Sequence, residues 1–424
     1  MDSGVEQLGI ELLAQADRLA EITEDPPRLT RTYLSPEHRA AGDYIASLMR
    51  AAGMQCNYDA LGNLVGRYEG AHPDAPVVVI GSHMDSVRNA GRYDGLFGIL
   101  SGIACVAELH RQRRRLAVAV EVVAFGDEEG VRFGVTLIGS KAMAGQFDPA
   151  WLAVRDAQGV SLAEALQAFG CDPQAWPGID RRARPPLAYL ESHIEQGPVL
   201  LNEGLPLGVV TAIAGAQRST VTLTGLAGHA GTVPMGARQD ALAAAAEMVL
   251  AIERIGAAQP GLVATVGRMQ VLPGAVNVIP QDVVFSIDVR SGLDSQRRAA
   301  IADIEAECDR IAARRRIALH REPLYLADAA PCHPVLQDCL VQAIAARGLA
   351  VRHLPSGAGH DAMVFPALAP AAMLFVRCGN GGISHHPDET LSAPDAGLAT
   401  LVLLDALLRV PAAFGLEALP AGVA

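Results

Sequence analysis

The chain of 424 residues lacks the cysteine pattern of a disulfide framework. Its seven cysteines are scattered and odd in number, and no two of them stand in Cys-x-x-Cys spacing. This usage is typical of reduced thiols in the cytosol. The N-terminus, Met-Asp-Ser-Gly-Val-Glu, lacks the basic and apolar regions of a signal peptide. We therefore expect a cytoplasmic protein.

Long apolar runs and long runs of one charge sign are also missing. No run reaches the roughly 18 to 20 uncharged apolar residues that a membrane span needs, and Glu247 interrupts even the alanine-rich stretch from Ala241. Acidic residues outnumber basic ones by 46 to 34, which disfavours a nucleic-acid groove. The basic cluster at residues 111–115 is interpreted as the solvated C-terminus of a helix. These features predict no membrane and no nucleic-acid partner.

The length exceeds what one hydrophobic core usually serves, so we expect two domains. Apolar runs that alternate with helical patterns in residues 1–210 and 323–424 predict an α/β domain with a mixed, mainly parallel sheet flanked by helices. Residues 211–322 follow a strand-helix-strand-strand-helix-strand order, which predicts an inserted ferredoxin-like α+β domain. Its expected elements are residues 217–223, 237–255, 262–271, 283–290, 296–314 and 317–321.

Two apolar runs lead directly into polar groups. Residues 77–80 lead to His83, and residues 118–125 lead to Glu128 and Glu129. Two buried parallel strands would bring these groups to the same edge of the sheet, beyond the carboxyl ends of the strands. Catalytic and binding groups of open α/β sheets are found at that edge.

Several charged or imidazole side chains each follow an apolar run, beside glycines or other small residues. They are His83, Asp85, Asp94, Glu128, Glu129, His193 and His385. Taken alone, each histidine is more often a satisfied polar group, and a Glu-Glu pair is more often solvated surface. Together they favour a metal centre, because buried charges are costly unless they are paired or bind metal. Imidazole, a bridging carboxylate and a glutamate pair are ligands of two-metal hydrolytic centres.

Eight segments in order resemble the allantoate amidohydrolase and N-carbamoyl-L-amino-acid hydrolase branch of the dinuclear M20 metallopeptidase superfamily. Each would be weak alone, and their order makes the resemblance specific. The segments are Gly-Ser-His-Met-Asp-Ser-Val (81–87), Tyr-Asp-Gly (93–95), Glu-Glu-Gly-Val-Arg-Phe (128–133), His-Ile-Glu-Gln-Gly-Pro (193–198), Gly-His-Ala-Gly-Thr-Val-Pro-Met (228–235), Val-Asn-Val-Ile-Pro (276–280), Ser-Gly-Ala-Gly-His-Asp-Ala (356–362) and Gly-Ile-Ser-His (382–385).

The resemblance implies a ligand set for two divalent metal ions per subunit. Asp94 would bridge both ions, His83 and His193 would complete one site, and Glu129 and His385 would complete the other. His386 competes with His385 for that role, and the position directly after serine favours His385. The ligand chemistry accommodates zinc or manganese, and also cobalt or nickel.

The resemblance also assigns roles beside the metals. Asp85 would hold the second nitrogen of the His83 imidazole, although a turn cap is the plain alternative. Glu128 is left without a metal and would act as the general base that moves a proton from water to the leaving nitrogen. Gln196 is a weaker candidate for substrate binding, because it could instead hold the turn after His193.

The inserted domain would supply substrate contacts. The resemblance places Arg218, Asn277 and Arg290 around the carboxylate and amide groups of the substrate, and a solvated strand arginine is the alternative for both arginines. His229 resembles a histidine that polarises the scissile carbonyl from the neighbouring subunit, which implies an obligate homodimer. Two departures from the family pattern are Ala90, where glycine is common, and Val233, where threonine is usual.

The predicted function is a two-metal amidohydrolase that cleaves the terminal ureido group of a small carboxylate-bearing substrate. We favour allantoate, which would give ureidoglycine, ammonia and carbon dioxide, because residues 29–37 resemble the N-terminal stretch of allantoate enzymes. An N-carbamoyl-L-amino-acid hydrolase is the alternative, followed by an aminoacylase-like peptidase. A non-catalytic binding relative is disfavoured, because the general base and all five ligand positions are filled.

Overall fold

The computed structural model of the protein describes residues 3–416, and the chain divides into two compact units. Unit 1 takes in the chain up to Thr211, residues Pro331–Leu354 and the chain from Ala358 onwards. Unit 2 comprises Ala212–Ala330 and Pro355–Gly357. The second boundary lies several residues beyond the expected position 323, because the last strand of unit 2 continues past it.

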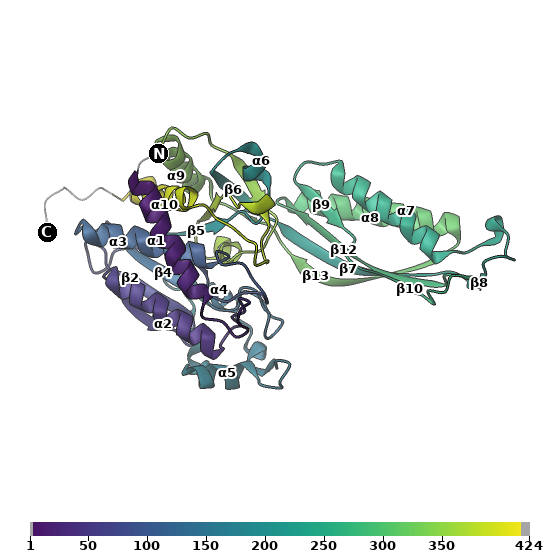
Figure 1. Ribbon diagram of the computed structural model, residues 1–424, viewed down its shortest axis with the longest axis horizontal. Helices are drawn as coiled ribbons and strands as arrows, with labels where there is room; N and C mark the ends of the chain where they lie inside the picture. Colours follow the sequence, from purple (N-terminus) through teal and green to yellow (C-terminus); the bar gives the residue numbers. More distant parts are fainter. Residues whose placement is uncertain (1–2, 417–424) are drawn as a thin grey trace. The chain divides into compact units, whose positions relative to one another are not determined.

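Unit 1 is built on a nine-stranded sheet with the order β1-β2-β4-β3-β5-β16-β6-β14, and β15 pairs with β6. Figure 1 labels β2, β4, β5 and β6 of this sheet. The central strands β4, β3, β5 and β16 are parallel, as expected, and β1, β2 and β6 pair antiparallel. The strands are β1 (Gln55–Tyr58), β2 (Leu64–Tyr68), β3 (Val77–His83), β4 (Ala119–Phe125), β5 (Ala188–Ile194), β6 (Leu207–Ile213), β14 (Ala330–Pro331), β15 (His353–Ser356) and β16 (Ala371–Val376).

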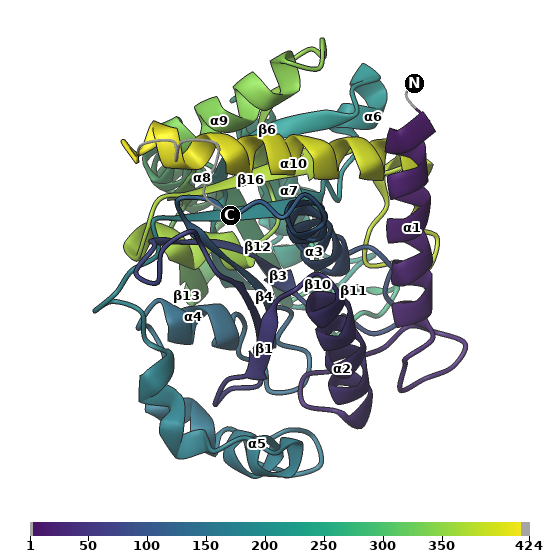
Figure 2. The same cartoon turned by 90° about the vertical axis from the view of Figure 1, so that its left-hand side faces the viewer.

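The helices of unit 1 include a packed group formed by α1, α3, α9 and α10. Figure 2 shows α1 crossing one end of α10, where Gly9 lies against the backbone of Ala393 so closely that a Cβ would not fit. The helices are α1 (Ser3–Ala20), α2 (Pro36–Ala51), α3 (Leu96–Arg111), α4 (Ile138–Met143), α5 (Leu162–Phe169), α6 (Val199–Glu203), α9 (Pro334–Ala345) and α10 (Ala393–Ala413), with 3-10 turns η1 (Pro149–Ala153), η2 (Pro173–Ile179), η4 (Asp361–Ala367) and η5 (Asn380–Gly382).

Helix α10 is the one described helix that is long and apolar enough to cross a membrane by length and composition. Most of its apolar stretch is buried inside unit 1, where it packs on α1, α3 and α9. A core helix of a globular domain has these same properties.

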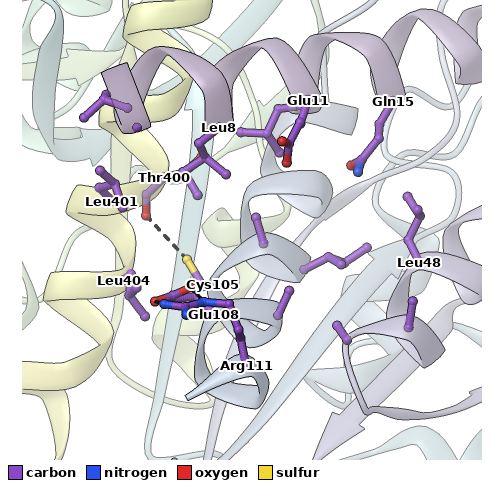
Figure 3. A pocket seen from close by; sticks show the side chains of 18 residues that line it. Leu8, Glu11, Gln15, Leu48, Cys105, Glu108, Arg111, Thr400, Leu401 and Leu404 are labelled. Atoms are coloured by element: carbon purple, nitrogen blue, oxygen red, sulfur yellow. Dashed lines mark hydrogen bonds and ion pairs between the residues drawn. The ribbon is translucent and has the colours of Figure 1, made fainter. Parts of the chain in front are cut away.

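A cavity of about 790 Å³ lies among α1, α2, α3 and α10. Figure 3 shows Leu8 and Leu404 on its mainly apolar lining, with the Cys105 thiol 3.5 Å from the carbonyl oxygen of Thr400. Burial raises the pKa of this thiol. None of the residues predicted for catalysis, metal binding or substrate binding lines this cavity.

Unit 2 has the predicted ferredoxin-like order, with sheet order β10-β12-β7-β13 and β9 paired to β12. All these pairs are antiparallel, and α7 and α8 cover one face of the sheet (Figure 1). The elements are β7 (Gly215–Thr224), β8 (Gly228–His229), η3 (Met235–Ala237), α7 (Ala241–Ala257), β9 (Leu262–Thr265), β10 (Met269–Leu272), β11 (Val278–Ile279), β12 (Asp282–Ser291), α8 (Asp294–Arg315) and β13 (Ala318–Ala327).

Two details of unit 2 differ from the sequence prediction. The expected strand over 262–271 is two strands, separated at Val266, Gly267 and Arg268. The last strand runs to Ala327 because it stays paired with β7 as far as Ala216, with a register shift between Pro323 and Tyr325. The apolar residues of β7 and β12 alternate, and their inward side chains form the core with α7 and α8.

His38 is a buried, uncharged histidine in the first turn of α2, where its main-chain N–H donates to the Ser35 hydroxyl. Its ring packs edge-on against Tyr33 and tilted against Phe169, at centroid distances of 5.6 and 5.5 Å. Neither ring nitrogen has a hydrogen-bond partner among the described residues. Burial lowers the pKa of His38 to about 4.

This pKa predicts a stability change in acid. Between pH 6.5 and about 4 the unfolded chain binds a proton that the folded chain does not, so His38 lowers the free energy of unfolding as the pH falls through this window. The full effect is about 3 kcal/mol. Chemical denaturation of wild type and His38→Phe across this range should show a steeper acid loss in wild type. If the free energy of unfolding of the two proteins changed equally with pH, the lowered pKa of His38 would be contradicted.

Candidate metal centre

The candidate ligands lie where parallel strands end. His83 ends β3 opposite Phe125, the last residue of β4, and His193 lies next to the end of β5. Asp94 precedes α3, and Gly95 follows it with φ +69°. A Cβ on Gly95 would lie 2.5 Å from the His83 carbonyl oxygen and 2.6 Å from its ring, so only glycine allows this approach.

The buried Asp94 carboxylate lies at the convergence of three imidazoles. Its Oδ1 is 3.2 Å from Nε2 of His193 and 3.6 Å from Nε2 of His83. Its Oδ2 is 3.0 Å from Nε2 of His385, which in turn lies 3.4 Å from Oε1 of Glu129. The two oxygens of one carboxylate therefore face two different sets of side chains.

The hydrogen bonds of the two buried histidines turn their Nε2 atoms inward. Nδ1 of His83 lies 3.0 Å from the main-chain oxygen of Asp85, and Nδ1 of His193 lies 2.8 Å from that of Ile194. A carbonyl can only accept, so each Nδ1 carries a proton, and in the neutral imidazole Nε2 is then the nitrogen that can bind a cation. Both Nε2 atoms face the Asp94 carboxylate, so a cation between them would be stabilised by the imidazoles and the carboxylate together.

Potential ligand atoms form groups within 4.8 Å of one another on both sides of Asp94. One group is His83, Asp94 and His193, and another is Asp94, Glu129 and His385. Oδ2 of Asp94 and Oε1 of Glu129 are buried and have no partner of good hydrogen-bond geometry among the described residues, although Nε2 of His385 lies 3.0 and 3.4 Å from them. Unsatisfied buried carboxylate oxygens are costly, so this donor set fits two divalent cations.

The electrostatics of the cluster agree with this fit. Burial raises the pKa of Glu129 to about 7, and Asp94 raises the pKa of His385 to about 9. Glu128 also lies within ligand distance of His83 and Glu129, and burial raises its pKa well above the usual range. Several carboxylates thus share a small volume in which positive charge is needed.

Asp85 has contacts beyond the one expected with His83. Its carboxylate is 3.6 Å from Nδ1 of His83, and its main-chain oxygen is the nearer partner of that nitrogen. The two carboxylate oxygens instead accept the N–H groups of Glu128 and Glu129, at 3.1 and 3.2 Å. Asp85 therefore holds the glutamate pair as well as the imidazole.

The structure places His385, rather than His386, beside Asp94. Nδ1 of His386 accepts the N–H of Asp388 on the same loop. Gln196 donates its amide to Oδ1 of Asp94 and to the Ser384 hydroxyl, each at 3.3 Å. In this arrangement Gln196 orients Asp94, a role that was not predicted from the sequence.

Unit 2 gathers its candidate residues into two pairs. Arg218 and Arg290 both donate to the Asp288 carboxylate, at 2.9 Å from Nε in each case, and Arg290 also donates to the carbonyl of Gly357. Asn277 directly precedes β11, whose Val278 pairs with the exposed His229 of β8, and the main-chain carbonyl of Asn277 accepts the N–H of Ala230.

Glu389 is among the buried residues near the site that were not predicted from the sequence. Glu389, on the loop that follows His385, accepts the N–H groups of Tyr93 and Asp94 and the hydroxyl of Ser384. In the sequence it stands in the polar segment His-His-Pro-Asp-Glu, where no apolar run indicates burial.

Comparison with known proteins adds a family and an activity class. The sequence pattern of peptidase family M20/M25/M40 matches residues 79–409. An N-carbamoyl-L-amino acid amidohydrolase of Geobacillus stearothermophilus is 41% identical over 396 residues, which are 93% of this chain and 97% of that protein. Allantoate deiminase 1 of Glycine max is 39% identical over 431 residues, which are 94% of this chain and 89% of that protein.

The fold agrees with this comparison. The crystal structure of an amidase of the hydantoinase/carbamoylase family from Burkholderia multivorans superimposes with a TM-score of 0.90 at 34% sequence identity. The match covers 95% of this chain and 97% of that chain.

The role of Asp85 gives a prediction for Asp85→Asn. The amide nitrogen introduced by this change would face one of the two N–H groups that the carboxylate accepts, so the glutamate pair should lose its fixed position. Metal affinity should fall by about 10- to 100-fold, measured by competition with a chelator. Hydrogen exchange of the Glu128 and Glu129 amides should accelerate in the metal-free protein.

The exposed Asp74 provides the matched control, and Asp74→Asn should change neither quantity. Unchanged metal affinity in Asp85→Asn would contradict the positioning role.

Proposed function

Because the chain belongs to peptidase family M20/M25/M40 and is an amidohydrolase acting on C–N bonds, we propose that it cleaves the ureido group of a small carboxylate-bearing substrate at a centre for two divalent ions. The convergence of three imidazoles and Glu129 on the Asp94 carboxylate is the observation that carries this proposal.

In the proposed centre Asp94 would bind both ions. His83 and His193 complete one site, and Glu129 and His385 complete the other. Two divalent ions held there would supply Lewis acidity and make water acidic enough to react near neutral pH. Zinc and manganese are our first choices, and cobalt and nickel suit the same donors.

Glu128 is proposed as the general base. It lies beside His83 and Glu129 but is not needed to complete either ligand group. The hydrogen bond from the main-chain N–H of Glu128 to Asp85 fixes the backbone of Glu128. Its carboxylate would take a proton from water and deliver it to the leaving nitrogen. The products of ureido cleavage would then be ammonia, carbon dioxide and the remaining amine.

Unit 2 is proposed to bind the substrate carboxylate through Arg218 and Arg290. Asp288 holds both guanidinium groups, and planar guanidinium groups suit bidentate binding of a carboxylate. Asn277 would contact the amide groups. The exposed His229 would act on the carbonyl of a substrate bound to the partner subunit, which requires a homodimer.

Allantoate remains our proposed substrate, and an N-carbamoyl-L-amino acid is the second candidate, supported by the relative from Geobacillus stearothermophilus. The stretch 29–37 that favours allantoate has a structural role here. The buried Arg31 donates to the main-chain oxygens of Met84 and Leu19, and Ser35 caps α2. Its effect on the substrate would therefore act through the position of the loop that follows His83.

A substrate panel tests the choice. Enzyme reloaded with each metal in turn should release ammonia from allantoate faster than from N-carbamoyl-L-methionine, and should leave N-acetyl-L-methionine intact. Ammonia from the carbamoyl amino acid but not from allantoate would make the second candidate correct. Hydrolysis of the acetyl compound alone would contradict the ureido specificity.

Glu128→Gln tests the general base. The amide cannot accept the proton, so kcat should fall by about 10²- to 10⁴-fold while KM changes little. Metal analysis should find the wild-type ion content in Glu128→Gln and a reduced content in Glu129→Gln. A Glu128→Gln enzyme with wild-type kcat would exclude Glu128 from this role.

A further inference from the structure

Glu389 is a buried carboxylate whose bonds connect two loops that are far apart in the sequence. Its Oε1 lies 2.8 Å from the N–H nitrogen of Tyr93 and 3.3 Å from that of Asp94, and its Oε2 accepts the hydroxyl of Ser384 at 2.7 Å. The first loop ends in Asp94, and the second carries His385 directly after Ser384. One carboxylate therefore joins the backbone that presents Asp94 to the Ser384 side chain on the loop that presents His385.

The same loops are joined a second time through Gln196. Its amide nitrogen donates to the Asp94 carboxylate and to the Ser384 hydroxyl. Asp94, Gln196, Ser384 and Glu389 thus form a closed ring of hydrogen bonds. In this ring the side chain of Asp94 is held from one side, and its backbone N–H is held from the other.

The neighbouring Gly91 leaves the space that Glu389 occupies. A Cβ at Gly91 would lie 2.2 to 2.4 Å from the carboxylate atoms of Glu389, and these are the three nearest atoms that it would meet. The φ angle of Gly91 lies outside the left-handed region, so alanine can adopt the same backbone conformation. The need for glycine at this position is steric, and it comes from Glu389.

The backbone of the joined loops is also held in an uncommon conformation. Asn89, Gln196 and His385 have φ values of +54°, +57° and +55°, in the left-handed region that side chains other than glycine rarely adopt. Such residues persist where the surrounding structure fixes them. The ring of hydrogen bonds supplies this constraint at Gln196 and on the loop that carries His385.

We propose that Glu389 is a positioning residue that sets the separation of Asp94 and His385, and that Gly91 provides its space. This inference rests on the proposed metal centre. Glu389 would touch neither substrate nor metal, and it would act through the loops that it joins. Its removal should widen the gap between Asp94 and His385, so the site formed by Asp94, Glu129 and His385 should lose affinity more than the other site.

The test uses Co²⁺ as the probe. Chelated full-length protein is titrated with Co²⁺ in competition with a chelator, and the absorption spectrum of the bound ions is recorded. Glu389→Ala should lower the Co²⁺ affinity of the site formed by Asp94, Glu129 and His385 by about 10- to 100-fold and alter the spectrum of the ion bound there. Glu389→Gln should lose less than about tenfold, because its amide oxygen still accepts the N–H groups through neutral bonds of about half the strength.

Gly91→Ala tests the steric part of the proposal. Its methyl group should displace the Glu389 carboxylate and weaken Co²⁺ binding in the wild-type background. In the Glu389→Ala background the same methyl group has space, so Gly91→Ala should add no further loss. Additive losses in the double variant would contradict the proposal.

Asp59→Ala is the matched control for simple destabilisation. Asp59 accepts the N–H groups of Leu61 and Asn63 and the side-chain amide of Asn63, the same number of bonds as Glu389. This change should lower the denaturation midpoint without changing Co²⁺ affinity. A wild-type protein that binds no pair of ions would overturn the proposed function, and with it this inference. Wild-type affinity in Glu389→Ala, with a normal ion pair in wild type, would overturn only the inference.

Discussion

The Asp94 carboxylate imposes the main constraint on unit 1. It is buried, and three imidazoles converge on it, two of which turn their Nε2 atoms toward it because their Nδ1 atoms bond to main-chain carbonyls. Glu128 and Glu129 add negative charge to the same volume. Such an arrangement is unfavourable without cations and strongly favourable with them. The fold must therefore hold several costly groups in place until metal binding compensates for their burial.

The parallel strands provide the rigidity for this task. β3 and β4 are paired from Val77 with Ala119 through His83 with Phe125, so both strands end at the same level of the sheet. β5 is parallel to β3 and brings His193 to the same edge. The loops from this edge then carry the remaining groups. Their positions depend on local bonds, such as those from Glu128 and Glu129 to Asp85.

The sequence was most informative where chemistry and hydrophobic pattern coincide. Apolar runs that end at His83, near Glu128 and at His193 were sufficient to predict parallel strands and a common edge. The order of elements in unit 2 predicted its antiparallel sheet. The contacts of Asp85 with two amides, the amide of Gln196 on Asp94 and the burial of Glu389 could not be predicted. They arise between segments whose approach is set by tertiary packing, and no periodic pattern records them.

The metal content of Asp94→Ala, compared with that of His385→Ala and wild type, tests the central claim most directly. Elemental analysis of each protein after exposure to excess Zn²⁺ and removal of free metal should find about two ions per wild-type chain. Because one carboxylate serves both ligand groups, Asp94→Ala should retain neither ion firmly, whereas His385→Ala should lose only one. Two firmly bound ions in Asp94→Ala would contradict the account.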